Sequence, residues 1–158
     1  MTFGEWALWG FAATVVLTTI MAGSQGLGLT RMNLPYMLGT LFTPHRDRAR
    51  LIGIAVHLVN GWIFALLYLA LFRAWGGGNL WRGAVVGAAH AAFVLTVVMP
   101  AFPAIHPRMA TEHGGHTTRR LLEPPGFLGV HYGYQTPVSV LIAHIVYGAM
   151  LGIFYRFG

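Results

Sequence analysis

The sequence predicts an all-α membrane protein with four transmembrane helices. Apolar residues make up 56% of the 158 residues and charged residues only 9%, far below the roughly 25% charge of a typical soluble domain. A chain so poor in charge cannot cover itself with a water-compatible surface, and its apolar runs do not alternate as the strands of a membrane barrel do. A third observation, a repeated pattern, predicts that the four helices are two copies of one hairpin.

Four segments are long and apolar enough to cross a hydrocarbon core of about 30 Å as helices. We expect these spans at about residues 6–29, 51–72, 81–102 and 137–154. Each helix satisfies its own backbone in lipid. The first is expected to be a span rather than a signal peptide, because Glu5 stands where a basic region would be required. We treat residues 1–158 as a single membrane domain.

The repeat is clearest in two helical segments. VHLVNGWIFALLY (56–68) and AHIVYGAMLGIFY (143–155) have His, Val, Gly and Tyr at the same spacing. Four further short matches occur in the same order in both halves: VLT with Met three residues later, Arg-Met, Pro-x-x-Leu-Gly and Thr-Pro. We therefore expect two tandem helix-loop-helix repeats, about residues 6–73 and 81–156. Both copies cross in the same sense, so a pseudo-twofold axis along the membrane normal should relate them.

The arginines predict the orientation. Seven of them lie in the linkers that follow the first and third spans: Arg31, Arg46, Arg48, Arg50, Arg108, Arg119 and Arg120. Three lie on the opposite side: Arg73, Arg82 and Arg156. The positive-inside rule places the arginine-rich linkers in the cytoplasm and both termini outside. The net charge of +6 then reflects orientation in the membrane rather than nucleic-acid binding.

Two histidines are the first candidates for chemistry, because histidine at membrane depth is costly and suggests a function. Each repeat places a His, a Gly and a Tyr along one helix stripe: His57, Gly61 and Tyr68, and then His144, Gly148 and Tyr155. If the two imidazoles face each other, they could be the axial ligands of a b-type haem, with the glycines making room for the flat ring.

A structural role is the alternative for these histidines, and it is the one we expect. In this interpretation each imidazole donates to a carbonyl of the Pro35–Gly39 or Pro125–Gly129 segment and fixes a linker to the bundle, while Tyr68 and Tyr155 are also structural. A proton relay or a substrate contact is a further alternative. His90, whose counterpart in the first repeat is Ala12, lies among small residues and is expected to bond a neighbouring helix.

The second linker, about residues 103–136, contains the candidate metal ligands His106, His113 and His116. Their spacing is not the zinc pattern HExxH, because Glu112 precedes the pair and two glycines interrupt a helix. We expect a solvated basic loop that contacts lipid headgroups or a partner. The chain has no cysteine and only four acidic residues, so it offers little for catalysis, and we expect no enzyme.

The stretch LGTLFTPHRDRARLIGIAVHLVNGWIFALLY, from Leu38 to Tyr68, resembles a group of small bacterial four-span inner-membrane proteins. The resemblance implies the bacterial inner membrane and no activity or functional residue. From the residues we expect a non-enzymatic subunit that packs into a larger membrane complex, with bound lipids and other subunits as partners. The alternatives are a b-type haem or metal protein and a small transporter or channel with its site at the repeat interface.

Overall fold

The computed structural model describes residues 2–111, 117–120 and 122–155. In this part of the chain all regular elements are helical, and four helices are long and apolar enough to cross a membrane. The spans are α1 (Phe3–Gly26), α3 (Arg46–Ala74), Leu80–Ile105 and α6 (Thr136–Phe154). The four-span helical fold predicted from the sequence is confirmed, with differences only at the helix ends.

The third span is one continuous helix with a π-helical turn in it. It consists of α4 (Leu80–Phe93), the π turn η1 (Val94–Val98) and α5 (Met99–Ile105). The Met99 N–H donates to the Val94 carbonyl five residues back, and not to the Leu95 carbonyl four residues back. The next residue, Pro100, has no N–H to donate to the Thr96 carbonyl. Such π turns often occur at functional sites, and Val94 lines the cavity described below.

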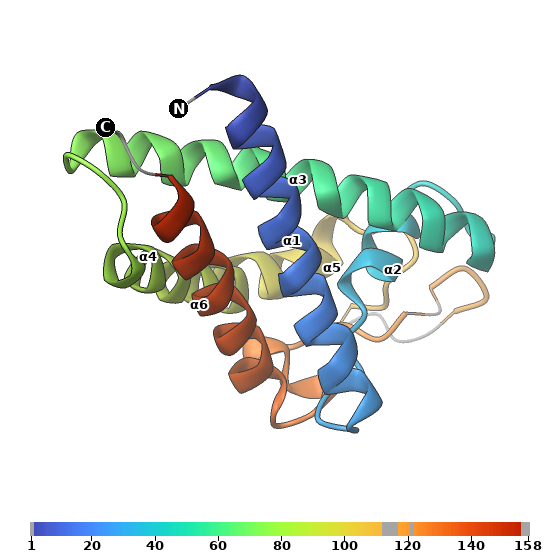
Figure 1. Ribbon diagram of the computed structural model, residues 1–158. Coiled ribbons are helices and arrows are strands. Elements are labelled where there is room, and N and C mark those ends of the chain that lie inside the picture. The colour runs from blue at the N-terminus through green and yellow to red at the C-terminus, as the bar shows by residue number, and fades with distance from the viewer. Residues whose placement is uncertain (1, 112–116, 121, 156–158) are drawn as a thin grey trace.

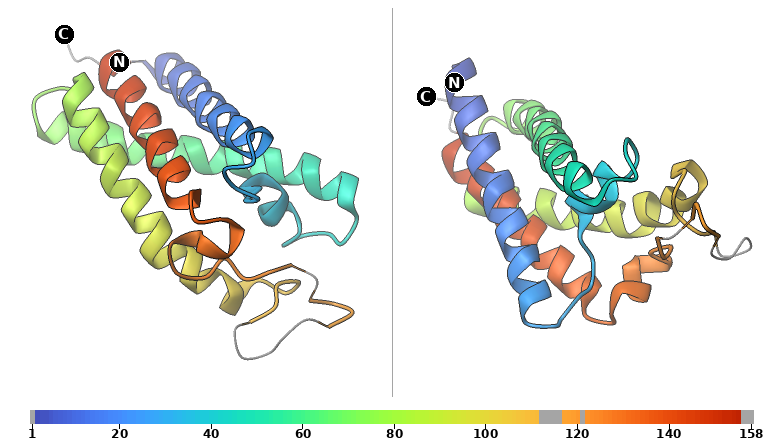
Figure 2. Two further views of the ribbon diagram at one scale, coloured as in Figure 1. Left: turned by 90° about the horizontal axis from the view of Figure 1, so that it is seen from below. Right: turned by 90° about the vertical axis from the view of Figure 1, so that its right-hand side faces the viewer.

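The spans pack in the order α3, α1, α6, α4. Helices α1 and α6 run antiparallel side by side and cross over α3 and α4 (Figures 1 and 2). The start of α1 lies at the end of α6, where the Trp9 ring stacks on Phe154 at 3.6 Å between centroids and the Tyr155 hydroxyl donates to the Trp6 carbonyl at 3.0 Å. The start of α1 and the end of α6 therefore lie at the same end of the bundle.

Glycines bring the backbones of α4 and α6 into direct contact. A Cβ atom added to Gly148 would lie 2.2 Å from the Gly83 carbonyl oxygen, and one added to Gly87 would lie 2.2 Å from the His144 oxygen. Neither position can carry a side chain without moving a helix. Small residues of this kind let membrane helices approach closely.

The two linkers form a layer at the opposite end of the bundle. In the first linker, residues 27–45, the short helix α2 (Leu34–Gly39) packs against α3 so closely that a Cβ on Gly53 would lie 1.7 Å from the Pro35 oxygen. The second linker, residues 106–135, contains the 3-10 segment η2 (Phe127–Tyr132). The linkers contact each other, since the Arg31 N–H donates to the Tyr132 carbonyl at 2.7 Å.

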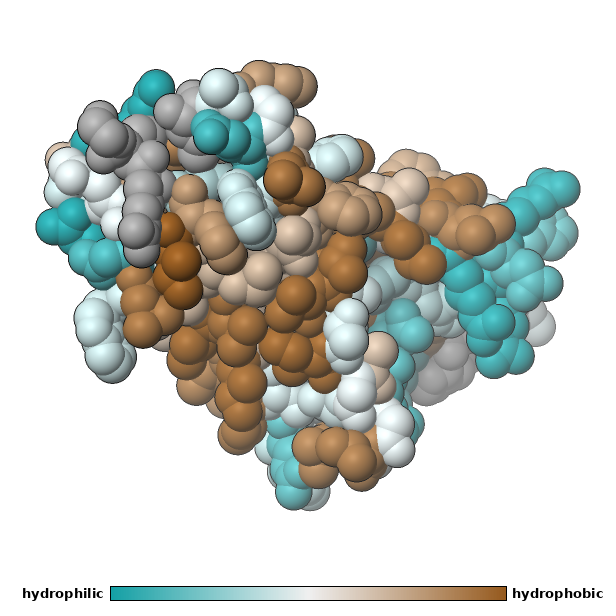
Figure 3. Space-filling view, in the orientation of Figure 1, coloured by the Kyte–Doolittle hydropathy of each residue, from teal (hydrophilic) through white to brown (hydrophobic). Residues whose placement is uncertain are grey.

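Apolar side chains cover the middle of the face in Figure 3, and polar ones gather at its ends, including the end where α3 begins. Many large apolar residues of α3 point away from the bundle, such as Ile63 at 53% exposure. This surface suits lipid.

The tandem repeat stays a prediction. A twofold axis would make the α1–α6 contact equivalent to a contact between α4 and α3. Helices α1 and α6 pack closely, whereas α3 and α4 barely touch.

Candidate functional site

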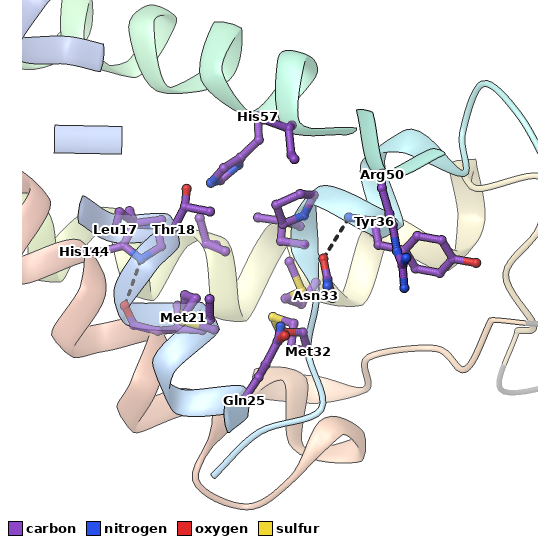
Figure 4. A pocket seen from close by; sticks show the side chains of 17 residues that line it. Leu17, Thr18, Met21, Gln25, Met32, Asn33, Tyr36, Arg50, His57 and His144 are labelled. Carbon is purple, nitrogen blue, oxygen red and sulfur yellow. Dashed lines mark hydrogen bonds between the residues drawn. The ribbon is translucent and has the colours of Figure 1, made fainter. Parts of the chain in front are cut away.

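The main candidate site is a cavity of about 280 Å³ inside the bundle, at the end nearer the linkers (Figure 4). We call it the histidine cavity, because His57 and His144 both line it. Its other walls come from α1, the first linker and the π turn of the third span. Apolar side chains form most of its surface: Leu17, Met21, Met32, Leu34, Ile54, Val94, Met99 and Val140.

His57 projects from α3 into the histidine cavity (Figure 4). Its ring is partly buried, and it makes no hydrogen bond to any described residue. A polar group inside a bundle normally has a partner. The imidazole of His57 is therefore available to a bound molecule.

His144 lies on the α6 side of the cavity and is 7% exposed. Its Nδ1 hydrogen bonds the Val140 carbonyl at 2.8 Å, so Nδ1 is the donor and Nε2 is left as an acceptor. Within residues 2–111, 117–120 and 122–155, no carboxylate lines the cavity. Together the two rings therefore present hydrogen-bonding groups to a largely apolar space, in which Gln25 and Asn33 are further polar lining residues.

His90 extends the polar cluster deeper into the bundle. A second cavity of about 110 Å³ is lined by all three histidines, His57, His90 and His144. The His90 ring stacks on Phe64 at 4.0 Å and meets the His144 ring edge-on at 4.7 Å between centroids. Its Nδ1 lies 3.2 Å from the Tyr68 hydroxyl of α3, which is the bond to a neighbouring helix that its sequence context suggests.

The residues around this cluster do not suit a haem between His57 and His144. The room left by Gly61 is filled by Thr14, whose Oγ1 lies 2.0 Å from an added Cβ, and Gly148 faces Gly83 rather than the cavity. The glycines therefore do not border a slot for a flat ring, and their expected role is corrected to helix packing. Among the described residues, no group of three His, Cys, Asp or Glu side chains could hold a metal ion.

The expectation that His57 and His144 fix the linkers is also wrong, because neither bonds the Pro35–Gly39 or Pro125–Gly129 segment. That role belongs to His106, which is 3% exposed. Its Nε2 donates to the Met37 carbonyl at 3.0 Å, and its Nδ1 accepts the Arg108 N–H at 3.1 Å.

Both nitrogens of His106 are thus occupied, which leaves none for the metal suggested by the sequence. Burial lowers the pKa of His106, and the nearby Arg108 adds to this effect, while the bond to Met37 opposes it. The other two candidates, His113 and His116, lie outside the described residues.

Two residues at the mouth of the histidine cavity were not singled out from the sequence. Arg50 and the ring of Tyr36 lie together at one edge of the cavity (Figure 4). Arg50 and His57 are seven residues apart on α3, which is close to two full turns and places them on one face. This spacing is visible in the sequence, but the sequence pattern alone indicates only the effect of Arg50 on orientation.

The geometry thus defines a helical bundle with four candidate membrane spans and a largely apolar cavity. The polar side chains of its lining are Thr18, Gln25, Asn33, Tyr36, Arg50, His57 and His144. No family model, no curated protein and no solved structure matches the chain.

Proposed function

We propose that this chain is a non-enzymatic membrane protein that binds a lipid-soluble amphipathic molecule in the histidine cavity. One observation carries this proposal. The polar ring of His57 lies on the wall of a largely apolar cavity within the spans and has no hydrogen-bonding partner among the described residues. Ligand sites are typically concave and apolar, with a few placed polar groups. His57 and the Nε2 of His144 supply such groups here.

Thermal unfolding of the detergent-solubilised protein tests this proposal with three probes: monoolein, oleate and decylubiquinone. A molecule that binds only the folded state raises the unfolding temperature in a concentration-dependent way. We expect at least one probe to do so for the native chain and to lose the effect in Ala22→Phe, which places a ring at the cavity wall.

Ala70→Phe is the matched control, since Ala70 is exposed on α3 and does not line the cavity. If none of the probes stabilises the native chain more than Ala22→Phe, binding in this cavity is refuted.

The second candidate function is the helical subunit expected from the sequence. The outer face of α3 supports it, because residues such as Leu67, 54% exposed, would pack against another protein as well as against lipid. Mass measurement of the protein extracted from native membranes in mild detergent tests this role. A particle no heavier than the chain with its detergent contradicts a stable complex.

The finer membrane assignment is also a proposal: the bacterial inner membrane, with the linker layer in the cytoplasm and both termini outside. Its support is the packing of the two arginine-bearing linkers at one end of the bundle. Because arginines are retained on the cytoplasmic side, this end is the inner one.

A further inference from the structure

We infer that the ligand of the histidine cavity is a single-chain amphipathic carboxylate, with its carboxylate on Arg50 and a neutral oxygen of the chain on His57. This inference rests on the proposed function and specifies its ligand. It uses the two polar groups that α3 presents to one cavity from the same helix face.

Arg50 is suited to hold an anion. It lines the cavity, and its nearest acidic partner is Asp47, at 3.9 Å with a side chain that is 94% exposed. Such a long, exposed ion pair contributes little, so the guanidinium remains able to hold a carboxylate through its fork of N–H donors. None of the acidic residues that the structure describes lines the cavity to compete for the guanidinium.

The spacing of the polar groups sets the form of the ligand. Seven residues of helix separate Arg50 from His57 by about 10.5 Å along the axis. Between them the wall is apolar, with Ile54 on α3 and Leu34 opposite in the first linker. A hydrocarbon stretch fits this wall, and a hydroxyl or keto oxygen at its far end would meet the imidazole.

The size of the cavity favours one chain. A volume of about 280 Å³ lies just below the usual range of small-molecule pockets, roughly 300–1,000 Å³. A two-chain phospholipid would leave a chain outside, whereas a fatty acid fits with its head at the linker end. That end carries the Arg50 side chain, 54% exposed, where a carboxylate stays in contact with water.

Affinities of oleate, monoolein, stearate and 10-hydroxystearate, measured by unfolding shifts, test the inference. Arg50→Gln should weaken oleate binding at least about tenfold, because a charge-assisted pair is lost, and leave monoolein unchanged. Arg50→Lys should retain oleate binding. His57→Phe should remove the preference for 10-hydroxystearate over stearate.

Arg48→Gln is the matched control, since Arg48 lies on the opposite face of α3 and outside the cavity. Monoolein binding without oleate binding, or oleate binding unaffected by Arg50→Gln, overturns the carboxylate while leaving the proposed function intact. Stronger Arg50-dependent binding of lysophosphatidylglycerol than of oleate also overturns it, since the head would then be a phosphate. Failure of every probe refutes both proposals together.

Discussion

Arg31 and Arg108 each reach across to the other's linker and bond equivalent positions there. Arg108 donates through Nη1 to the carbonyls of Thr40, at 2.6 Å, and Leu41, at 3.2 Å. Arg31 donates through Nη2 to the carbonyl of His131, at 2.5 Å. Each linker contains a Pro-x-x-Leu-Gly segment that ends in a glycine. Leu41 is the second residue after this glycine in the first linker, and His131 is the second residue after it in the second. The two arginines therefore connect the linkers through positions that correspond relative to the two Pro-x-x-Leu-Gly segments.

The two arginines should differ in their contribution to stability. Arg108→Ala leaves two carbonyls of the first linker without a charged donor and should lower the free energy of unfolding by about 1.5–3 kcal/mol. Arg31→Ala should cost less, because its side chain is 68% exposed and its ion pair with Glu123 is on the surface. Chemical unfolding in detergent micelles measures both. Arg119→Ala, an exposed position in the same layer, is the control, and equal losses in all three variants would contradict the contacts.

The pH dependence of stability should include His106. Its pKa is lowered in the folded protein, chiefly by burial, so the unfolded chain binds the proton more readily and acid favours unfolding. The stability should be complete above the unfolded pKa, about 6.5, and fall as the pH drops from there towards the lower folded pKa.

Unfolding in micelles between neutral and acidic pH measures this loss, and His106→Gln should flatten it. A variant with the same acid sensitivity as the native chain would show that other groups cause it.

Part of this architecture could be predicted from the sequence. Hydropathy and length were sufficient for the four spans, because helices in lipid have few alternatives. The sequence pattern does not identify the histidine that fixes a linker. The motif suggested His57 and His144, but the fold of the second linker, which has no periodic pattern, places His106 against Met37. Such contacts depend on how irregular segments pack and leave no spacing to detect.

The histidine cavity could likewise be predicted only in part from the sequence. The helix stripe with His57 is visible in the sequence, but no sequence pattern indicates the π turn at Val94, which helps form the cavity wall. Glycine spacing did indicate close packing of helices, yet it could not show that Gly148 faces Gly83 instead of a ligand.

Two glycines should respond in opposite ways to the same substitution. Gly148→Ala places a Cβ 2.2 Å from the Gly83 oxygen and must push α4 and α6 apart, so we expect a loss of about 1–3 kcal/mol, as for overpacking. Gly23→Ala meets nothing within 4 Å and should stabilise α1 by about 0.5–1 kcal/mol. Unfolding of both variants under one condition measures the contrast. If Gly148→Ala is neutral, the close helix contact is not present.

Single cysteines should report the orientation cleanly, because the chain contains none. A cysteine at Thr117 should react with an impermeant reagent only after the inner side is opened, and one at Gly77 should react in intact cells. Seven of the ten arginines lie on the Thr117 side, which the positive-inside rule assigns to the cytoplasm. The opposite labelling pattern would invert the assignment and move the mouth of the histidine cavity to the outer side.

A substitution at His57 should separate function from stability. His57→Phe replaces a ring that has no hydrogen bond to a described residue with an apolar ring of similar shape. The desolvation cost of an unpaired polar group disappears, so the empty protein should unfold with a free energy about 1 kcal/mol higher. Binding of a probe that bonds the imidazole should weaken at the same time, since functional groups are often held at a cost to stability.

Tyr147→Phe is the matched comparison for this variant. It removes the bond that the Tyr147 hydroxyl donates to the Gly61 carbonyl at 2.7 Å, and should therefore lower stability by about 1 kcal/mol. Unfolding of both variants, with and without probe, gives the two free energies for each. A loss of stability in His57→Phe that equals the loss in Tyr147→Phe would mean that His57 already has a structural partner, and the reason for assigning a ligand to the cavity would be gone.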